Sequence, residues 1–166
     1  MKKISIILII ISALTNSCSV NYSLSGKSIS PEVQTFSVSH IANQSQQTVP
    51  TLSNDITEEL KNKFRSQAGL QHVNQNGHLE FKGKIVTYDV SYLGVTASQE
   101  AAQNKLTISV EIEHTNNIDP TKNFKKRYTS TREFEASGGD SVEKSYIPEM
   151  IDEIITEIFM DSVANW

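Results

Sequence analysis

The sequence predicts an α+β fold, a two-layer sandwich in which a four-stranded mixed sheet carries two helices on one face, in the order β-α-β-β-β-α. Two segments have apolar residues at helical spacing, and four others alternate apolar and polar residues as strands do. Short turns join the last three strands, which favours an antiparallel meander, whereas a helix follows the first strand as in a crossover connection. The second face of the sheet is expected to be open to water or to a partner.

The first seventeen residues predict a lipoprotein signal peptide. Two lysines precede an apolar run at residues 4–14, and this run is too short for a bilayer span, which needs about twenty residues. Ser17 is the small residue that cleavage requires, and Cys18, the only cysteine, then becomes the first mature residue. Thr15 stands where such signals usually have leucine. We expect cleavage before Cys18 and lipid on Cys18, with an uncleaved N-terminal anchor as the alternative.

The mature chain begins with a polar tether at residues 18–31, which contains several serines. Lipid on Cys18 would hold the protein in the outer-membrane bilayer, since several acyl chains together anchor firmly. Ser19 follows the cysteine and no acidic cluster does. By resemblance to lipoprotein sorting rules, this favours the periplasmic face of the outer membrane. Residues 32–166 then form a single domain, large enough to bury a substantial core.

The first strand is expected at residues 33–40 and the first helix at residues 51–67. One apolar stripe runs along this helix at every fourth residue, and Gly69 is a natural stop. The stripe consists of Leu52, Ile56, Leu60 and Phe64.

Three further strands are expected at residues 79–92, 105–114 and 124–136. In the first of these the apolar phase changes between Ile85 and Val86, which predicts a bulge near Gly83. The second alternates most regularly, which predicts one buried and one wet face. The third is polar for a central strand, so we expect it at an edge or on a partner surface.

The last helix has two possible starts. Asp140 and Glu143 can form a capping box, which would leave Pro148 inside the helix. Alternatively the helix begins near Ser145, and Pro148 falls in the tolerated first turn. We expect the second arrangement.

The sequence does not predict an enzyme, a cofactor or a metal site. None of the four histidines has metal-ligand spacing with another, and no phosphate loop or nucleophile elbow is present. The net charge of −4 does not indicate a nucleic-acid partner, which usually requires a basic surface.

Five cations stand out in this acidic chain, around the start of the last strand. Such a patch could bind the phosphates of an amphipathic lipid. The alternative is that cations protect an edge strand from aggregation. The five residues are Lys122, Lys125, Lys126, Arg127 and Arg132.

Several segments together resemble the LptE-type lipopolysaccharide-assembly lipoproteins, in the form found in Bacteroidetes-like bacteria. They are residues 21–26 (NYSLSG), 51–64 (TLSNDITEELKNKF), 79–91 (LEFKGKIVTYDVS) and the final Asn165 and Trp166. The resemblance covers essentially the whole mature chain, and the order of the segments supports it more than any one of them.

This resemblance implies a non-enzymatic protein that plugs the LptD β-barrel of the outer membrane, helps the barrel to assemble and assists delivery of lipopolysaccharide to the cell surface. The five cations then become candidate contacts for lipopolysaccharide phosphates, an inference from charge and not from a family motif. The competing hypothesis is a stand-alone periplasmic lipoprotein that binds lipid or peptidoglycan without a barrel partner.

Overall fold

The computed structural model describes residues 29–47, 49–94 and 102–163. The predicted signal peptide, Cys18, most of the tether and residues 164–166 lie outside the described residues.

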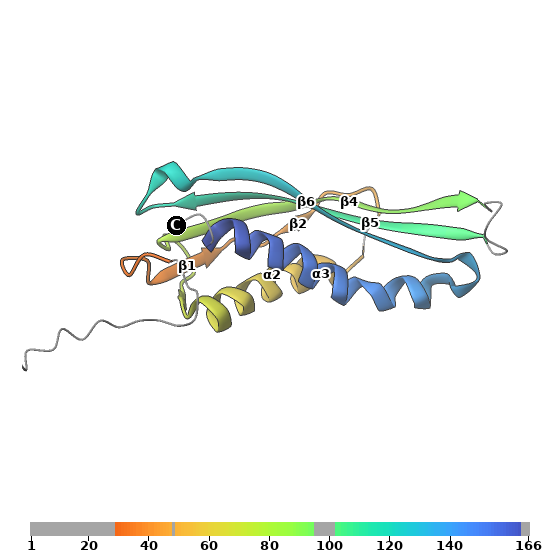
Figure 1. The fold of residues 1–166 in the computed structure, drawn as a ribbon, viewed down its shortest axis with the longest axis horizontal. Coiled ribbons are helices and arrows are strands. Elements are labelled where there is room, and N and C mark those ends of the chain that lie inside the picture. The colour runs from red at the N-terminus through yellow and green to blue at the C-terminus, as the bar shows by residue number, and fades with distance from the viewer. Residues whose placement is uncertain (1–28, 48, 95–101, 164–166) are drawn as a thin grey trace, which may run out of the picture.

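One mixed sheet forms the upper layer in Figure 1, and helices α2 and α3 pack against one of its faces. The strand order is β3-β1-β4-β5-β6, and β2 also pairs with β4. Strands β3, β1 and β4 pair in parallel, as do β2 and β4, whereas β4, β5 and β6 pair antiparallel. The strands are β1 Thr35–Val38, β2 Ala42–Asn43, β3 Gln71–His72, β4 Leu79–Gly94, β5 Gln103–Asn116 and β6 Phe124–Glu135. The predicted α+β class is confirmed, and two short strands, β2 and β3, bring the sheet to six strands instead of four.

The long β4–β5 hairpin extends beyond α2 in Figure 1 and is interrupted by a bulge. Ile85 lies opposite Val110 and Thr87 opposite Ser109, so Val86 has no opposite residue in β5. The predicted phase change is confirmed, because an extra residue turns the following side chains to the other face. Glycine is needed at position 83 for a different reason, because a Cβ there would lie 2.5 Å from the side chain of Ile112.

The first helix matches its prediction. Helix α2 spans Leu52–Lys63 and continues into a π-helical turn, η1, at Phe64–Ala68. Gly69 ends it in a left-handed conformation with φ of 70°. The ring centroid of Phe64 lies 4.5 Å from that of Phe81 on β4 and 5.2 Å from that of Phe159 on α3. The apolar stripe of α2 therefore joins the sheet to the second helix.

The predicted start of the last helix near Ser145 is wrong. Helix α3 spans Gly139–Val163, following a 3-10 turn, η3, at Ala136–Gly138, and Pro148 lies inside it. The turns before Pro148 are supported by contacts with the sheet: Tyr146 packs near Phe134, and the Tyr88 hydroxyl donates to Glu143. These contacts compensate for the backbone donor that the proline removes.

Two tight places lie at one end of the sheet. Gly77 precedes β4 where the chain passes against β1, and a Cβ there would lie 2.6 Å from both the Phe36 carbonyl carbon and the Ser37 nitrogen. The buried imidazole of His114 lies between two rings, with centroids 4.7 Å from Phe81 and 4.9 Å from Phe124. Neither His114 nitrogen makes a hydrogen bond in the described part of the chain.

Candidate functional site

The face of the sheet that the helices leave uncovered is polar along three strands. On β5 the residues that face the helices, Leu106, Ile108, Val110 and Ile112, are fully buried, so the alternate residues point to the other side. We call this other side the open face. Its side chains include Glu80, Lys82, Lys84, Thr87, Asp89 and Ser91 on β4, Lys105, Thr107, Ser109, Glu111 and Glu113 on β5, and Lys125, Arg127, Thr129, Thr131 and Glu133 on β6.

The strand register brings six charged residues of the open face together in two rows. In each row a glutamate on β5 lies between a cation on β4 and a cation on β6. The rows are Lys82–Glu113–Lys125 and Lys84–Glu111–Arg127, and we call these six residues the ion cluster. The cluster has four cations and two carboxylates, and Glu80 on β4 adds a third carboxylate 3.9 Å from Lys82 Nζ, so one positive charge remains in excess.

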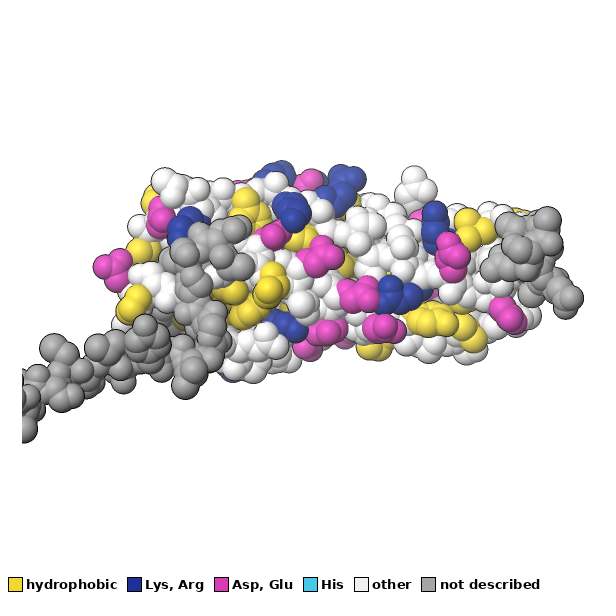
Figure 2. Space-filling model, in the orientation of Figure 1, with side chains coloured by type: hydrophobic (Ala, Val, Ile, Leu, Met, Phe, Trp, Pro, Cys, Tyr) yellow, Lys and Arg dark blue, Asp and Glu magenta, His cyan; other side chains and the backbone are white. Residues whose placement is uncertain are grey.

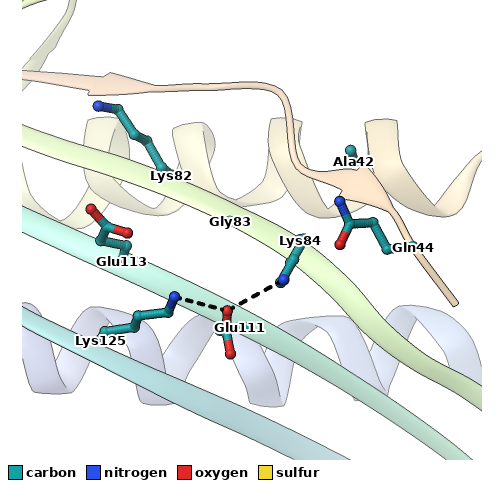
Figure 3. A pocket seen from close by; sticks show the side chains of 8 residues that line it. All are labelled: Ala42, Gln44, Lys82, Gly83, Lys84, Glu111, Glu113 and Lys125. Atoms are coloured by element: carbon teal, nitrogen blue, oxygen red, sulfur yellow. Dashed lines mark ion pairs between the residues drawn. The ribbon is translucent and has the colours of Figure 1, made fainter.

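Glu111 is the centre of the ion cluster. Its carboxylate lies 3.2 Å from Lys125 Nζ and 3.7 Å from Lys84 Nζ (Figure 3). It also lies 4.0 Å from Arg127 Nη2. The hydrogen bond from Lys125 is the main reason why the pKa of Glu111 lies below its usual value. Glu111 therefore stays ionised, and three cations share its charge.

A shallow hollow of about 260 Å³ lies over the ion cluster. Figure 3 views it from the open face, with the helices behind the sheet, and shows the lysines of β4 and β6 on either side of the glutamates. The side chains of Lys82, Lys125 and Arg127 are about 60% exposed, so they are available to an anionic ligand. The hollow is lined by Ala42, Gln44, Lys82, Gly83, Lys84, Glu111, Glu113 and Lys125.

The structure divides the five cations that the sequence singles out. Lys125 and Arg127 belong to the ion cluster. Lys126 and Arg132 point to the opposite face of β6, as the alternation of a strand requires, and pair with carboxylates of α3. Lys122 lies in the 3-10 turn η2, Pro120–Lys122, with its Nζ 3.9 Å from Asp119.

The cations that face α3 help to hold that helix on the sheet. Lys126 Nζ lies 2.6 Å from Asp161, which also accepts a hydrogen bond of 2.9 Å from the buried Tyr128 hydroxyl. Arg132 pairs with Glu149 at 3.2 Å and with Glu153. The hydrogen bond from Arg132 lowers the pKa of Glu153. On the side of the molecule shown in Figure 2, basic and acidic side chains accordingly lie next to one another.

Sequence reasoning missed four members of the ion cluster. Lys82 and Lys84 alternate on one strand, as do Glu111 and Glu113 on the next, and this spacing alone places each pair on one face. The signal was present in each strand separately. Only the register shows that the pairs lie side by side.

Among the described residues, no group of three or more His, Cys, Asp or Glu side chains could hold a metal ion. None of the helices in the described ranges is long and apolar enough to cross a membrane.

Comparison with solved structures finds the same fold in other bacterial proteins. A minor lipoprotein from Acinetobacter baumannii has a TM-score of 0.54 at 16% identity, covering 81% of this chain and 95% of that one. A hypothetical protein from Chlamydia trachomatis has a TM-score of 0.50 at 8% identity, covering 76% and 93%. The rare lipoprotein B from Shewanella oneidensis has a TM-score of 0.46 at 11% identity, covering 75% and 93%. At these identities the first two matches show the fold alone.

The family follows from the sequence comparison. No curated protein sequence matches the chain. The family model described as LptE, lipopolysaccharide-assembly, matches residues 33–162, which include every strand and helix of the described domain except the last residue of α3. The chain therefore belongs to the LptE family of lipopolysaccharide-assembly lipoproteins, which are not enzymes.

Proposed function

We propose that this protein plugs an LptD-type β-barrel of the outer membrane, helps that barrel to assemble and assists delivery of lipopolysaccharide to the cell surface. Lipid on Cys18 would attach it to the periplasmic leaflet. Family membership supports the general role in lipopolysaccharide assembly.

The polar open face is the observation that carries the proposal of a plug. The lumen of a membrane β-barrel is polar, so a domain inside it needs a hydrophilic exterior around a packed core. The open face supplies hydroxyl and charged side chains along three strands. Its ion pairs are partly exposed and can exchange partners with a polar wall.

Purification of the full-length protein in mild detergent tests this proposal. We expect a large β-barrel protein to co-purify in a one-to-one ratio and to be identified by mass spectrometry. A monomer that retains lipid or peptidoglycan fragments but no barrel would contradict the proposal and favour a stand-alone binding lipoprotein.

We further propose that the ion cluster contacts lipopolysaccharide phosphates. Of the five cations predicted from the sequence, Lys125 and Arg127 are the proposed contacts, and Lys82 and Lys84 join them. The positive charge that remains after Glu80, Glu111 and Glu113 are paired is what a phosphate would neutralise.

Replacing Lys125 and Arg127 by glutamine is expected to weaken lipopolysaccharide binding about tenfold at low salt, since two charge-assisted contacts are lost. The difference from the wild type should shrink as salt rises, because salt screens exposed charges. Surface plasmon resonance on immobilised lipopolysaccharide at several salt concentrations measures both effects.

The matched control is Lys126→Gln with Lys144→Gln, which removes two positive charges from the helix side of the molecule. We expect this control to bind nearly as the wild type does. Equal loss in both variants would show a general effect of net charge. No loss in either would leave the ion cluster as protection of an edge strand.

A further inference from the structure

A second hollow lies farther along the open face. It has a volume of about 390 Å³, within the range of roughly 300–1,000 Å³ that is usual for small-molecule sites. We call it the glutamine hollow. It is lined by Ser45, Gln46, Gln47, Val86, Thr87, Tyr88, Asp89, Ser91, Lys105 and Thr107.

The glutamine hollow is rich in polar groups that have no partner. Within the described ranges, six of its side chains make no hydrogen bond or ion pair. They offer amides, hydroxyls, one carboxylate and one ammonium, so donors and acceptors lie together. These side chains are Gln46, Gln47, Thr87, Asp89, Lys105 and Thr107.

The rim that carries the glutamines is held by its own hydrogen bonds. The Asn43 side-chain oxygen accepts from the Ser45 backbone N–H at 2.9 Å, and the Ser45 hydroxyl donates to the Gln47 carbonyl at 2.6 Å. These bonds fix the backbone that carries Gln46 and Gln47, so less of the loop has to be ordered when a ligand binds.

The bulge of β4 adds an apolar group to this polar hollow. Val86 is the extra residue of the bulge and lines the hollow, half-buried, beside Thr87. Bulges commonly redirect a side chain in this way. One apolar contact among many hydroxyl and amide groups suits a sugar ring, which has C–H faces and hydroxyl edges.

The two hollows lie in line along β4. The ion cluster uses Lys82 and Lys84, and the glutamine hollow begins two residues later at Val86. A ligand that occupies both would carry an anionic group at one end and a hydroxyl-rich ring at the other. We infer that the glutamine hollow binds a sugar ring of a phosphorylated saccharide while the ion cluster binds its phosphate; this rests on the proposed role in lipopolysaccharide delivery.

Titration of the full mature chain in detergent with deacylated lipopolysaccharide, which keeps the sugars and phosphates but not the acyl chains, tests the inference. We expect saturable binding by calorimetry, weakened about fivefold by Thr107→Val and by Gln47→Ala, since each removes one hydrogen-bonding group from the hollow. Dephosphorylated saccharide should bind more weakly than the phosphorylated form.

The matched control is Thr131→Val. Thr131 lies opposite Thr107 in the β5–β6 register, on the same face, but does not line the hollow. We expect it to bind as the wild type does. Equal weakening by Thr107→Val and Thr131→Val would overturn the assignment, as would a wild-type chain that binds a soluble peptidoglycan fragment but not deacylated lipopolysaccharide.

Failure of this inference is distinguishable from failure of the proposed function. If a barrel co-purifies but the deacylated saccharide does not bind, only the saccharide site is lost. If no barrel co-purifies, the proposed plug is lost whatever the titration shows.

Discussion

Replacing Gly77 by alanine is expected to lower the free energy of unfolding by about 3 kcal/mol. The added Cβ would lie 2.6 Å from two backbone atoms, the Phe36 carbonyl carbon and the Ser37 nitrogen. Phe36 is completely buried and β1 is paired on both sides, so this backbone has no room to move. Urea denaturation followed by circular dichroism measures the loss.

Gly139→Ala is the matched control for this substitution. Gly139 has φ of +57°, but a Cβ there meets no atom within 4 Å. It should cost only the strain of a backbone conformation with φ of 57° and ψ of −160°, which is nearly restricted to glycine, about 2 kcal/mol. If Gly77→Ala costs no more than the control, the close approach between β1 and the segment before β4 is not what requires glycine there.

The second large effect is a loss of stability at acid pH. Burial lowers the pKa of His114 to about 4, whereas an unfolded histidine titrates near 6.5. As pH falls from about 6.5 to 4, the unfolded chain binds a proton that the folded chain does not. The contribution of His114 to stability is therefore complete above about pH 6.5. The free energy of unfolding decreases by about 3 kcal/mol as the pH falls from there to about 4.

His114→Leu should remove this part of the pH dependence and most strongly stabilise the protein at pH 4.5 relative to the wild type. His72, whose pKa is also lowered mainly by burial, leaves a smaller dependence of the same sign. Denaturation at a series of pH values between 4 and 8 measures it. The exposed His40, replaced by glutamine, is the control and should follow the wild type. Parallel curves for His114→Leu and the wild type would contradict the prediction.

Much of the sheet was predictable because its long strands repeat a simple pattern. The alternation in β5 and the phase change in β4 place one face of each strand in the core, and the structure agrees. Strands β2 and β3 have two residues each, which is too short for any period to appear. They exist because β4 and β1 offer free edges, which is a property of the assembled sheet.

The start of α3 shows why local signals fail at a helix boundary. Pro148 favours a start near Ser145 when only neighbouring residues are considered. The decisive partners, Tyr88 and Phe134, are distant in the chain and support the turns before the proline. Their contribution becomes visible only when α3 lies on the sheet.

The candidate site was predictable in part for the same reason. The alternation of Lys125, Lys126 and Arg127 indicates correctly that the basic residues of β6 divide between two faces. Lys84 belongs to the ion cluster because β4 pairs with β5 and places it opposite Glu111. Such pairing joins residues far apart in sequence and cannot be read from one strand.

The bulge at Val86 also affects how this chain should be compared with distant relatives. Before it, odd-numbered residues of β4 such as Leu79, Phe81 and Ile85 enter the core, and after it the even-numbered Tyr88 does. At 8–16% identity, an alignment has few anchors with which to place one extra residue. If the alignment gap opposite the extra residue is misplaced, core positions of one protein are matched with surface positions of the other along the rest of the strand. Residue-by-residue comparison of the open face therefore needs the structures superposed first.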